Sequence, residues 1–469
     1  RPGHPPPMKP FARIPAATPS PHEAGTIWTG SDDGLVHVSR DDGGTWREVT
    51  PPDMPAHTRV MTVAVSPHDP ASAMVAGIRY EMDDRSPYAW RTDDYGTTWT
   101  RISDGIPDGA FVRVVREDPK RAGLLYGGTE HGVVVSFDGG AHWSDLSFGL
   151  PDTPVTGLSV EERDLVISTH GRSFWVLDDI ETLRQVDADV ASADVHLFQP
   201  GDAIRRSVPA VIDFRAGQPG TEGQRTRLDI FTDDGEHVRT LVDAIVDSGT
   251  QRARWNLRYP GAVTFDGIVL EGGNPAVGPW APPGRYRARL TVDGMTREAT
   301  FDVHPDPRLD DIPAAAFTDQ FRLAMAIRDA ESRANTSVLL ARDLRAQADA
   351  IVARSDDAGL RDLVSRFAAG VEAVAGELYQ LRNQSPKDKI AFPIKLNDRL
   401  TGLRSHLERG DGTPTGAYQA VFDELSAELD VHLQDLERML SDRLPRLNRR
   451  LEEAGLPQIV VRDAPIADG

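Results

Sequence analysis

The chain has 469 residues, which is too long for a single hydrophobic core and indicates two to four domains. Its 72 acidic and 52 basic residues give a formal net charge of −20. This charge argues against nucleic acid and anionic membranes as partners, because a phosphate surface attracts a basic face. The sequence contains no cysteine, which excludes disulfides, thiolate metal sites and cysteine nucleophiles, and no segment reaches the ~20 apolar residues of a membrane span.

The chain begins with Arg1, and we expect residues 1–10 to form a disordered Pro-rich segment. From there to residue 200, the most informative feature is a pattern, Ser/Thr-x-Asp-x-Gly-x-x-Trp, that occurs three times. The copies are Ser39-Arg-Asp41-Asp-Gly43-Gly-Thr-Trp46, Thr92-Asp-Asp94-Tyr-Gly96-Thr-Thr-Trp99 and Ser136-Phe-Asp138-Gly-Gly140-Ala-His-Trp143. The tryptophans are 53 and 44 positions apart, a period typical of repeat architectures.

Each copy belongs to a larger unit of four short strands: strand, Pro-containing turn, strand ending in Gly, strand, Asp-containing turn, strand. Four such units open near Phe11, Val60, Val112 and Val155, and they predict a partial β-propeller of about four blades over residues 11–200. We expect the first unit to be degraded, because Pro15 and Pro19 interrupt its opening strand. The fourth unit lacks the pattern and ends in Ser173-Phe-Trp-Val-Leu-Asp-Asp179.

Every residue type in the repeated pattern has a structural use. The Asp accepts hydrogen bonds from backbone N–H groups in a tight turn, and the Ser or Thr hydroxyl supports the same turn. The Gly supplies a backbone angle closed to other residues, and the Trp is expected to be buried between neighbouring blades. We therefore predict a scaffold role rather than a catalytic one. An incomplete propeller exposes strand edges, so the remaining blades are expected from upstream sequence or from a second chain.

The later part of the chain changes character twice. Residues 201–304 contain short alternating strands around Asp234-Gly235 and Asp293-Gly294 and predict an immunoglobulin-like β-sandwich with a long Gly- and Pro-rich loop, Gly261–Gly284. Residues 305–313 form a linker. An α-helical bundle is predicted over 314–469, with helices near 314–353, 357–383, 392–409 and 416–454.

The last predicted helix has a stripe of apolar residues spaced by threes and fours. This stripe suits an intrachain core or, alternatively, a coiled-coil seam, and Pro445 either kinks the helix or starts a new one. The stripe consists of Phe422, Leu425, Leu429, Leu433, Leu436, Leu440, Leu444, Leu447 and Leu451.

The three repeats resemble the BNR or Asp-box propellers, a group that includes sialidases, sortilin-type receptors and xyloglucan-cleaving endoglucanases. The ending Thr169-His-Gly-Arg-Ser-Phe-Trp-Val-Leu-Asp-Asp179 is similar to that of large exported bacterial proteins labelled sortilin-like or glycosyl-hydrolase-like. In those proteins a sandwich similar to that of flagellar hook-capping proteins follows, and then helices. The resemblance implies a C-terminal portion of a longer protein that is secreted or periplasmic.

Candidate ligand-binding residues occupy equivalent positions in the four units. They are Asp32, Asp33, Asp83, Asp84, Glu130, His131, His170 and Arg172. Such a set of acids, histidines and an arginine suits a polar ligand or a cation, and the alternative interpretation is a row of hydrophilic turn residues. We expect a binding or interaction protein that recognises a protein, peptide or glycan at the propeller face.

The alternative is a glycoside hydrolase with two facing carboxylates, whose site lies partly in missing N-terminal blades. No catalytic residue can be named, since neither the endoglucanase aspartates nor the sialidase arginine triad can be matched to this sequence. No cofactor and no metal ion are expected, because the sequence has no nucleotide-binding loop and no zinc-binding helix.

Overall fold

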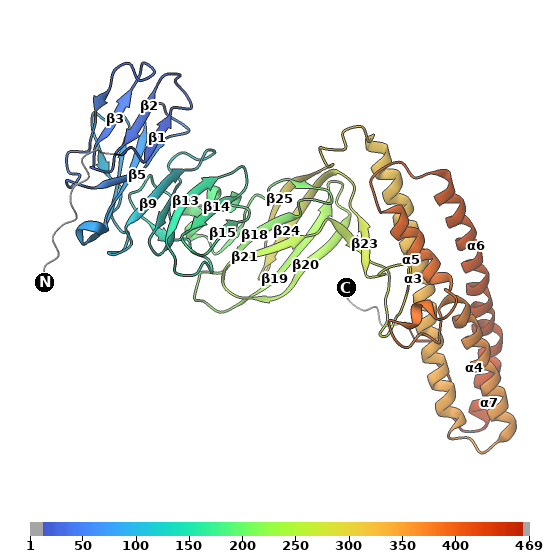
Figure 1. The fold of residues 1–469 in the computed structure, drawn as a ribbon. Coiled ribbons are helices and arrows are strands. Elements are labelled where there is room, and N and C mark those ends of the chain that lie inside the picture. The colour runs from blue at the N-terminus through green and yellow to red at the C-terminus, as the bar shows by residue number, and fades with distance from the viewer. Residues whose placement is uncertain (1–12, 463–469) are drawn as a thin grey trace. The chain divides into compact units, whose positions relative to one another are not determined.

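The computed structural model describes residues 13–462 (Figure 1), so the predicted Pro-rich segment 1–10 lies outside the described residues. The chain divides at Asp194 into two compact units. Several antiparallel β-sheets occupy the first unit and the start of the second, and helices follow towards the C-terminus.

The first unit contains four antiparallel sheets in chain order, and each is built from consecutive strands. The first sheet consists of β1 (Ala16–Pro19), β2 (Ile27–Gly30), β3 (Val36–Ser39) and β4 (Arg47–Glu48), and the second of β5 (Arg59–Val65), β6 (Ala73–Arg79), β7 (Asp84–Thr92) and β8 (Thr100–Arg101), with the 3₁₀ turn η1 (Tyr80–Met82) between β6 and β7. The third sheet consists of β9 (Val112–Glu117), β10 (Leu125–Thr129), β11 (Gly132–Ser136) and β12 (Ser144–Asp145). The fourth consists of β13 (Val155–Val160), β14 (Leu165–Thr169) and β15 (Phe174–Leu177), and helices α1 (Glu181–Gln185) and α2 (Ala188–Ser192) follow it.

The first sheet is more regular than its prolines predict. A four-residue β1 forms and pairs with β2 from Ala16 to Pro19. Pro19 lacks an N–H group, but β1 is an edge strand of its sheet, and an edge position tolerates that loss. The predicted degradation of this unit is therefore wrong for the strand itself.

Consecutive sheets pack face to face. One apolar core joins the first sheet to the second, another joins the second to the third, and a third joins the third to the fourth. The first strands of neighbouring sheets are linked by Thr18 Oγ1, which donates to the Val63 carbonyl at 2.7 Å, and by Thr62 Oγ1, which donates to the Arg113 carbonyl at 2.9 Å. The same relation between neighbours is thus repeated along the unit.

Two histidines that the sequence analysis did not single out join the first turns of neighbouring sheets. His22 Nε2 lies 3.1 Å from the Ser66 carbonyl oxygen, and His68 Nε2 lies 2.7 Å from that of Asp118. Both histidines follow a Ser-Pro pair in the turn between the first and second strands. The turns of this type therefore meet at one end of the sheets, and the loops between second and third strands lie at the opposite end.

The tryptophans of the second and third repeats dock on the preceding sheet. Trp99 Nε1 donates to the Val49 carbonyl and Trp143 Nε1 to the Ile102 carbonyl, both at 2.7 Å. The glycines of these repeats make the close approach possible, because a Cβ on Gly96 would lie 2.5 Å from Val49 Cβ and one on Gly140 would lie 2.6 Å from Ile102 Cβ.

Trp46 behaves differently from the prediction. Its side chain is 45% exposed, and the only atoms near a Cβ placed on Gly43 belong to Trp46 itself. The reason is topological: no sheet precedes the first one among the described residues, so this ring has no neighbouring sheet to cover it.

The two tryptophans make a matched pair of substitutions. We expect Trp99→Ala to lower the free energy of unfolding by about 2–3 kcal/mol, because it removes a partly buried ring and a hydrogen bond to Val49. Trp46→Ala should cost less than about 1 kcal/mol. Urea unfolding of the full chain measures both values, and equal losses would contradict the docking role.

The β-rich part of the second unit consists of two main sheets that share one apolar core. Trp255 of β21 and Tyr286 of β24 contact edge to face within that core, with their ring centroids 5.0 Å apart. One sheet has the order β16 (Val195–Leu197), β18 (Ala210–Ala216), β21 (Gly249–Trp255); the other has the order β17 (Ala203–Ile204), β25 (Met295–His304), β24 (Gly284–Val292), β19 (Gln224–Thr232), β20 (His237–Val246); a short ribbon pairs β22 (Arg258–Pro260) with β23 (Val277–Trp280).

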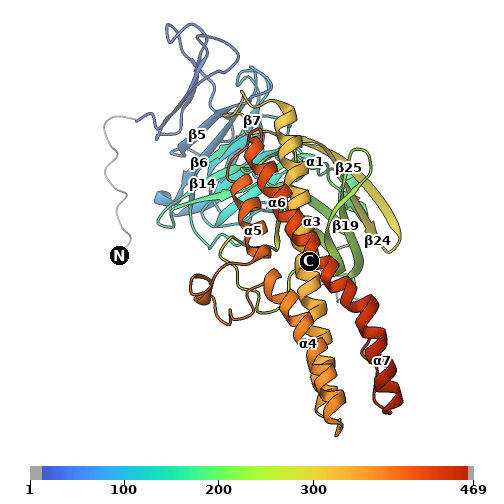
Figure 2. The ribbon, with the colours of Figure 1, turned by 90° about the vertical axis from the view of Figure 1, so that its right-hand side faces the viewer.

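The helices begin and end close to the predicted positions (Figure 2). Asp357 caps the N-terminus of α4 by accepting from the Gly359 and Leu360 amides. Pro445 lies in the first turn of α7, directly after a π-helical turn, and helical backbone angles at Met439, Arg443 and Leu444 join α6, η3 and α7 into one continuous helix with a π-bulge before the proline. The elements are α3 (Ala314–Val352), α4 (Ala358–Leu378), η2 (Asp388–Ile390), α5 (Leu396–Leu407), α6 (Gly416–Arg438), η3 (Met439–Arg443) and α7 (Leu444–Glu453).

The leucine stripe of α6 and α7 belongs to an intrachain core. Leu425, Leu429 and Leu436 are buried in α6, and Leu447 and Leu451 in α7, in one cluster with residues of α3, α4 and α5. This is the intrachain alternative of the two that the sequence left open.

The Gly- and Pro-rich loop after β22 is attached to the helices by buried polar groups. Asp398 of α5 accepts from the backbone amides of Glu271 and Gly272, at distances between 2.6 and 3.1 Å. Asn335 of α3 donates to the Val263 carbonyl at 2.7 Å. The loop is thus a structural connection between sheets and helices within the second unit.

Candidate functional site

Seven of the eight candidate residues lie in one recurring loop, between the second and third strands of their sheet, and Asp84 is the first residue of β7. Asp32 and Asp33 follow β2, Asp83 follows η1 after β6, Glu130 and His131 follow β10, and His170 and Arg172 follow β14. All eight are at the end opposite to the histidine-linked turns. The connections from the fourth strand of one sheet to the first strand of the next also lie at this end. We call this surface the loop face.

Most of the acidic side chains on the loop face accept hydrogen bonds from residues of their own loop or of an adjacent segment of the chain. Glu130 Oε2 accepts from Arg113 Nε at 3.0 Å and Nη2 at 2.6 Å. Asp32 Oδ1 accepts from the Arg13 amide at 2.8 Å, and Asp33 accepts from the Ser31 hydroxyl. These contacts orient the loops and leave few oxygen positions for a ligand.

Asp84 is engaged most completely. It accepts from Arg79 Nε at 2.9 Å, from the Tyr88 hydroxyl at 2.8 Å and from the Ser86 amide at 3.1 Å. Burial alone would raise the pKa of Asp84, but these hydrogen bonds outweigh it and lower the pKa. A general acid needs the opposite shift, so Asp84 is poorly suited to protonate a leaving group.

The remaining candidates point outward. Asp83, with φ of 60°, ends η1 and is exposed, as are His170 and Arg172. His131 is exposed and its Nδ1 lies 2.8 Å from Asp152 Oδ1, in the connection to the fourth sheet. These four side chains supply both charge signs and titratable nitrogens to the loop face.

Exposed apolar side chains share this surface, and the sequence analysis missed them. Tyr80 and Met82 of η1 are exposed, and Tyr80 stacks on Phe111 with ring centroids 5.5 Å apart. Phe148, in the connection after β12, is 75% exposed. The sequence signal that could have identified Tyr80 and Met82 was the extra turn between β6 and β7, because an insertion at this position lengthens the loop on the binding side of a repeat.

The repeated Asp turns have the predicted geometry. In the second repeat, Asp94 Oδ1 accepts from the Thr98 amide and from the Thr92 hydroxyl at 2.8 Å, and the Thr92 hydroxyl accepts from the Gly96 amide at 2.9 Å. The first and third repeats have the same three bonds, around Ser39, Asp41 and Gly43 and around Ser136, Asp138 and Gly140.

These hydrogen bonds make the turn carboxylates strongly acidic. The Thr98 amide and hydroxyl lower the pKa of Asp94 to about 2. Because the folded-state pKa lies below the unfolded value of about 3.9, the contribution of Asp94 to stability is present above that value and is lost as the pH falls towards 2.

We therefore expect Asp94→Asn to lower the free energy of unfolding by about 1–2 kcal/mol at neutral pH. The difference from the native chain should shrink between about pH 4 and pH 2. Urea unfolding at several pH values measures it, with the exposed Asp104→Asn as control. A difference that stays constant down to pH 2 would contradict the assignment.

The fourth sheet retains part of the repeat, although the sequence pattern is lost. In each of the other sheets, the backbone amide of the residue that follows the repeat Asp donates to a backbone carbonyl located two residues before the second strand. In the fourth sheet the amide of Ile180 donates in the same way, to the Arg163 carbonyl at 2.8 Å. Asp179 therefore stands at the place of the repeat Asp, and Arg184, five residues later, stands at the place of the Trp. The matching bonds are Asp42 N to Gly25 O, Tyr95 N to Ala71 O and Gly139 N to Gly123 O.

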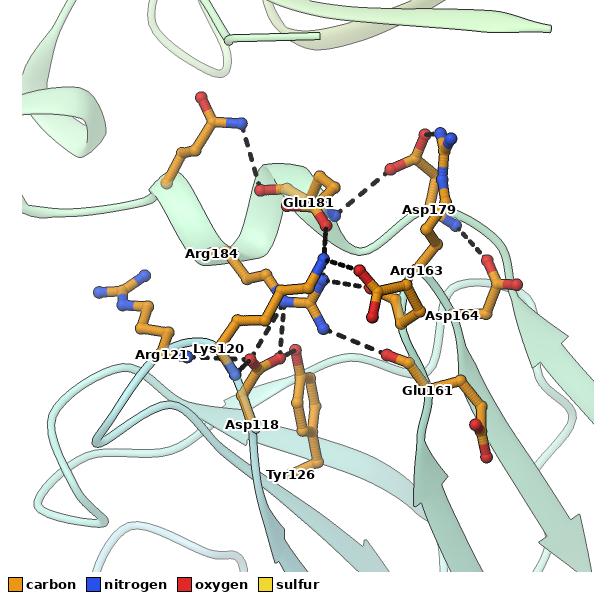
Figure 3. Close-up of polar contacts among 12 residues, drawn as sticks. Asp118, Lys120, Arg121, Tyr126, Glu161, Arg163, Asp164, Asp179, Glu181 and Arg184 are labelled. Carbon is orange, nitrogen blue, oxygen red and sulfur yellow. Dashed lines mark hydrogen bonds and ion pairs between the residues drawn. The ribbon is translucent and has the colours of Figure 1, made fainter. Parts of the chain in front are cut away.

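Arg184 also contacts the preceding sheet, but through charge (Figure 3). Its Nε donates to both oxygens of Asp118, at 3.1 and 2.9 Å, and the Asp118 side chain is fully buried. Tyr126 OH donates to the same carboxylate at 3.2 Å. Burial opposes the charge of Arg184, but the bond to Asp118 raises its pKa overall.

The surrounding contacts complete a clamp on α1. Arg184 Nη1 donates to Glu181 at 2.6 Å, and Lys120 Nζ contacts Glu181 and Glu162 at 3.0 and 2.8 Å (Figure 3). Since both Asp118 oxygens are occupied and buried, this cluster is a structural clamp rather than a reaction centre. It directs the chain after β15 towards the third sheet.

We expect Arg184→Met to lower the free energy of unfolding by about 3–5 kcal/mol, because it leaves the Asp118 carboxylate buried and uncompensated. Lys120→Met, whose side chain is partly exposed, should cost less than about 1 kcal/mol. Combining Arg184→Met with Asp118→Leu should restore part of the loss. Equal effects of the two single substitutions in urea unfolding would contradict the clamp.

The second unit has a hollow of about 580 Å³ between α5 and α6. Its wall is mainly apolar, with Leu403, Tyr418 and Val421 among the lining residues. Both oxygens of Asp398, which also borders it, are already bonded to the loop amides. Asp398 is therefore already engaged and is not available to a ligand in this hollow.

Two features are absent from the described residues, 13–462. These residues contain no group of three or more His, Asp or Glu side chains placed to hold a metal ion. Within the same range, no helix has the length and apolar character that crossing a membrane requires.

No protein-family model and no curated protein sequence matches the chain. Solved structures give remote similarities. YCF48 bound to a D1 peptide is 14% identical with a TM-score of 0.28, over 49% of this chain and 68% of that one. YCF48 from Cyanidioschyzon merolae is 16% identical with a TM-score of 0.28, over 62% and 95%. The GH74 xyloglucanase from Xanthomonas campestris is 15% identical with a TM-score of 0.28, over 61% and 46%. At these values the similarities carry no argument about activity or ligand.

Proposed function

We propose that the chain is a binding protein in which the four sheets of the first unit are blades of a β-propeller, and that its loop face recognises a protein, peptide or glycan. The two sheets of the second unit form an immunoglobulin-like sandwich that includes β16 and so begins near residue 195 rather than at the predicted 201, and it ends at 304. Residues 305–313 are a linker to a helical bundle that begins at 314. Export from the cytoplasm, as a secreted or periplasmic protein, is part of the proposal and rests on the resemblance carried by the ending Thr169–Asp179.

The observation that carries the proposal is the composition of the loop face. Four successive sheets present the same loop at one end, and exposed aromatic and charged side chains gather there: Tyr80, Phe148, His131, His170 and Arg172. Aromatic residues and arginine contribute most of the binding energy in protein interfaces. An aromatic ring also offers an apolar surface with a polar edge to a sugar.

The first sheet supports the proposal that further blades adjoin this unit. In the second and third repeats, the Trp donates to the backbone carbonyl of an aliphatic residue of the preceding sheet, and the Gly packs against the side chain of that same residue. The first repeat has the same Trp and Gly at Trp46 and Gly43, with the indole ring half exposed. The remaining blades are therefore proposed partners on this side of the first sheet.

We do not propose glycoside hydrolysis for the loop face. That reaction needs one protonated and one free carboxyl group on opposite sides of a sugar. Glu130 is bonded to the Arg113 guanidinium, and Asp84 has a lowered pKa and three donors. Asp84 is thus held in the charged form, and Glu130 is already paired with a cation of its own sheet.

A glycan array and a random peptide library, applied to the full chain, test the proposal. We expect ligands selected from one of them to lose affinity by about tenfold or more with Phe148→Ala or Arg172→Ala. Glu162→Gln, an exposed change at the opposite end of the sheets, should leave binding unchanged.

Two results would overturn the proposal. One is the absence of any selected ligand that is sensitive to the loop-face substitutions. The other is release of reducing ends from a polysaccharide panel that stops with Glu130→Gln, since this would identify an enzyme.

A further inference from the structure

The fourth sheet has an open edge of unusual composition. It contains three strands, and among the described residues no strand pairs with the outer edge of β15. β15 reads Phe174-Trp-Val-Leu177, without a charge, and Phe174 is 76% and Val176 53% exposed. Natural edge strands are usually shortened, charged or covered, because an unpaired apolar edge recruits another strand.

The three complete sheets show what belongs at this edge. In each of the four sheets of the first unit, the first residue of the second strand pairs with the last residue of the third strand. These last residues are Ser39, Thr92, Ser136 and Leu177, which therefore occupy equivalent positions. In the complete sheets the fourth strand pairs antiparallel with the two residues before the aligned position. The corresponding residues of the fourth sheet are Trp175 and Val176.

The fourth strands of the complete sheets share a short pattern. They read Trp46-Arg-Glu-Val49, Trp99-Thr-Arg-Ile102 and Trp143-Ser-Asp-Leu146, so that two polar residues stand between an aromatic and an aliphatic one. The two polar residues are exposed in each case, whereas Val49, Ile102 and Leu146 are buried.

The aliphatic residue also defines the register. Its amide donates to the carbonyl of Val36, Ala89 or Val133, at 2.8 or 2.9 Å. These three residues are fully buried, and all of them correspond to Phe174. The Phe174 carbonyl and, two residues on, the Val176 amide therefore face the open edge.

Among the described residues, 13–462, no segment fills this edge. After Ile180 the chain enters α1, and Arg184, at the sequence position of the repeat Trp, is bound to the buried Asp118 of the third sheet. The segment after β15 is thus held on the third sheet and not beside β15.

We propose that β15 accepts an extended polypeptide segment of the pattern Trp-polar-polar-aliphatic, which adds antiparallel to Val176 and Trp175 as the fourth strand of the fourth sheet. The ladder hydrogen bonds supply affinity, and the aliphatic residue packs beside Phe174, as Val49 does beside Val36. This site lies on a strand edge and is separate from the loop face of the proposed function.

The test uses a synthetic peptide with the sequence of residues 96–104, Gly-Thr-Thr-Trp-Thr-Arg-Ile-Ser-Asp, and the full chain. We expect binding to slow backbone hydrogen exchange at the Val176 amide by about tenfold or more. A peptide in which Ser replaces the Trp and the Ile should bind about tenfold more weakly.

Matched variants separate strand addition from apolar adhesion. Val176→Pro removes the amide that faces the open edge and leaves the bonds to β14 in place, so it should abolish binding. Val176→Thr keeps the amide and the branched shape and should retain it. Phe174→Lys, which adds a charge of the kind that protects natural edges, should weaken binding if the Pro variant does not fold.

Equal affinity for the native chain and Val176→Pro, or protection that appears only elsewhere, would overturn the proposal. Phe148→Ala on the loop face should leave binding of this peptide unchanged. Failure of strand addition is therefore distinguishable from failure of the loop-face function.

Discussion

The structure of the first unit depends on one contact, the docking of each Asp turn on the end of the sheet before it. The turn presents a Trp donor and a Gly, and the preceding sheet presents an aliphatic side chain and its carbonyl. Gly96 and Gly140 allow Val49 and Ile102 to approach where any Cβ would collide. The carboxylate of the turn accepts from a backbone amide and from side chains of the same turn, so it organises the contact.

This contact also explains the two ends of the row of sheets. The first sheet has the Asp turn with its Trp and Gly, but no sheet precedes it among the described residues, and Trp46 is exposed as a result. The fourth sheet has lost the Gly and the Trp of the pattern, and the ion pair of Arg184 with Asp118 attaches its continuation to the third sheet instead. A charged pair at a fully buried site costs desolvation and requires close geometry, and here that geometry diverts the chain from the edge of β15.

Much of the architecture was readable because periodic patterns report local structure. The three Asp turns, the helix limits and the place of Pro445 follow from short-range rules of turns, caps and apolar spacing. The candidate residues Asp32 to Arg172 lie in or directly beside the loops between second and third strands, and their role in binding stays a prediction. Their partners were not predictable: Arg113 for Glu130 and Tyr88 for Asp84 are contacts that only the register of neighbouring strands creates.

By itself, the sequence determined the repeat, the order of sheets and helices, and the structural role of the Asp turns, since these depend on residues close together in the chain. The tertiary structure alone decided which tryptophan is covered, which acids are engaged and which strand edge stays open. Trp46, Trp99 and Trp143 have the same local pattern. They differ in burial because burial depends on whether another sheet lies beside them, and no local pattern encodes the presence of a neighbour.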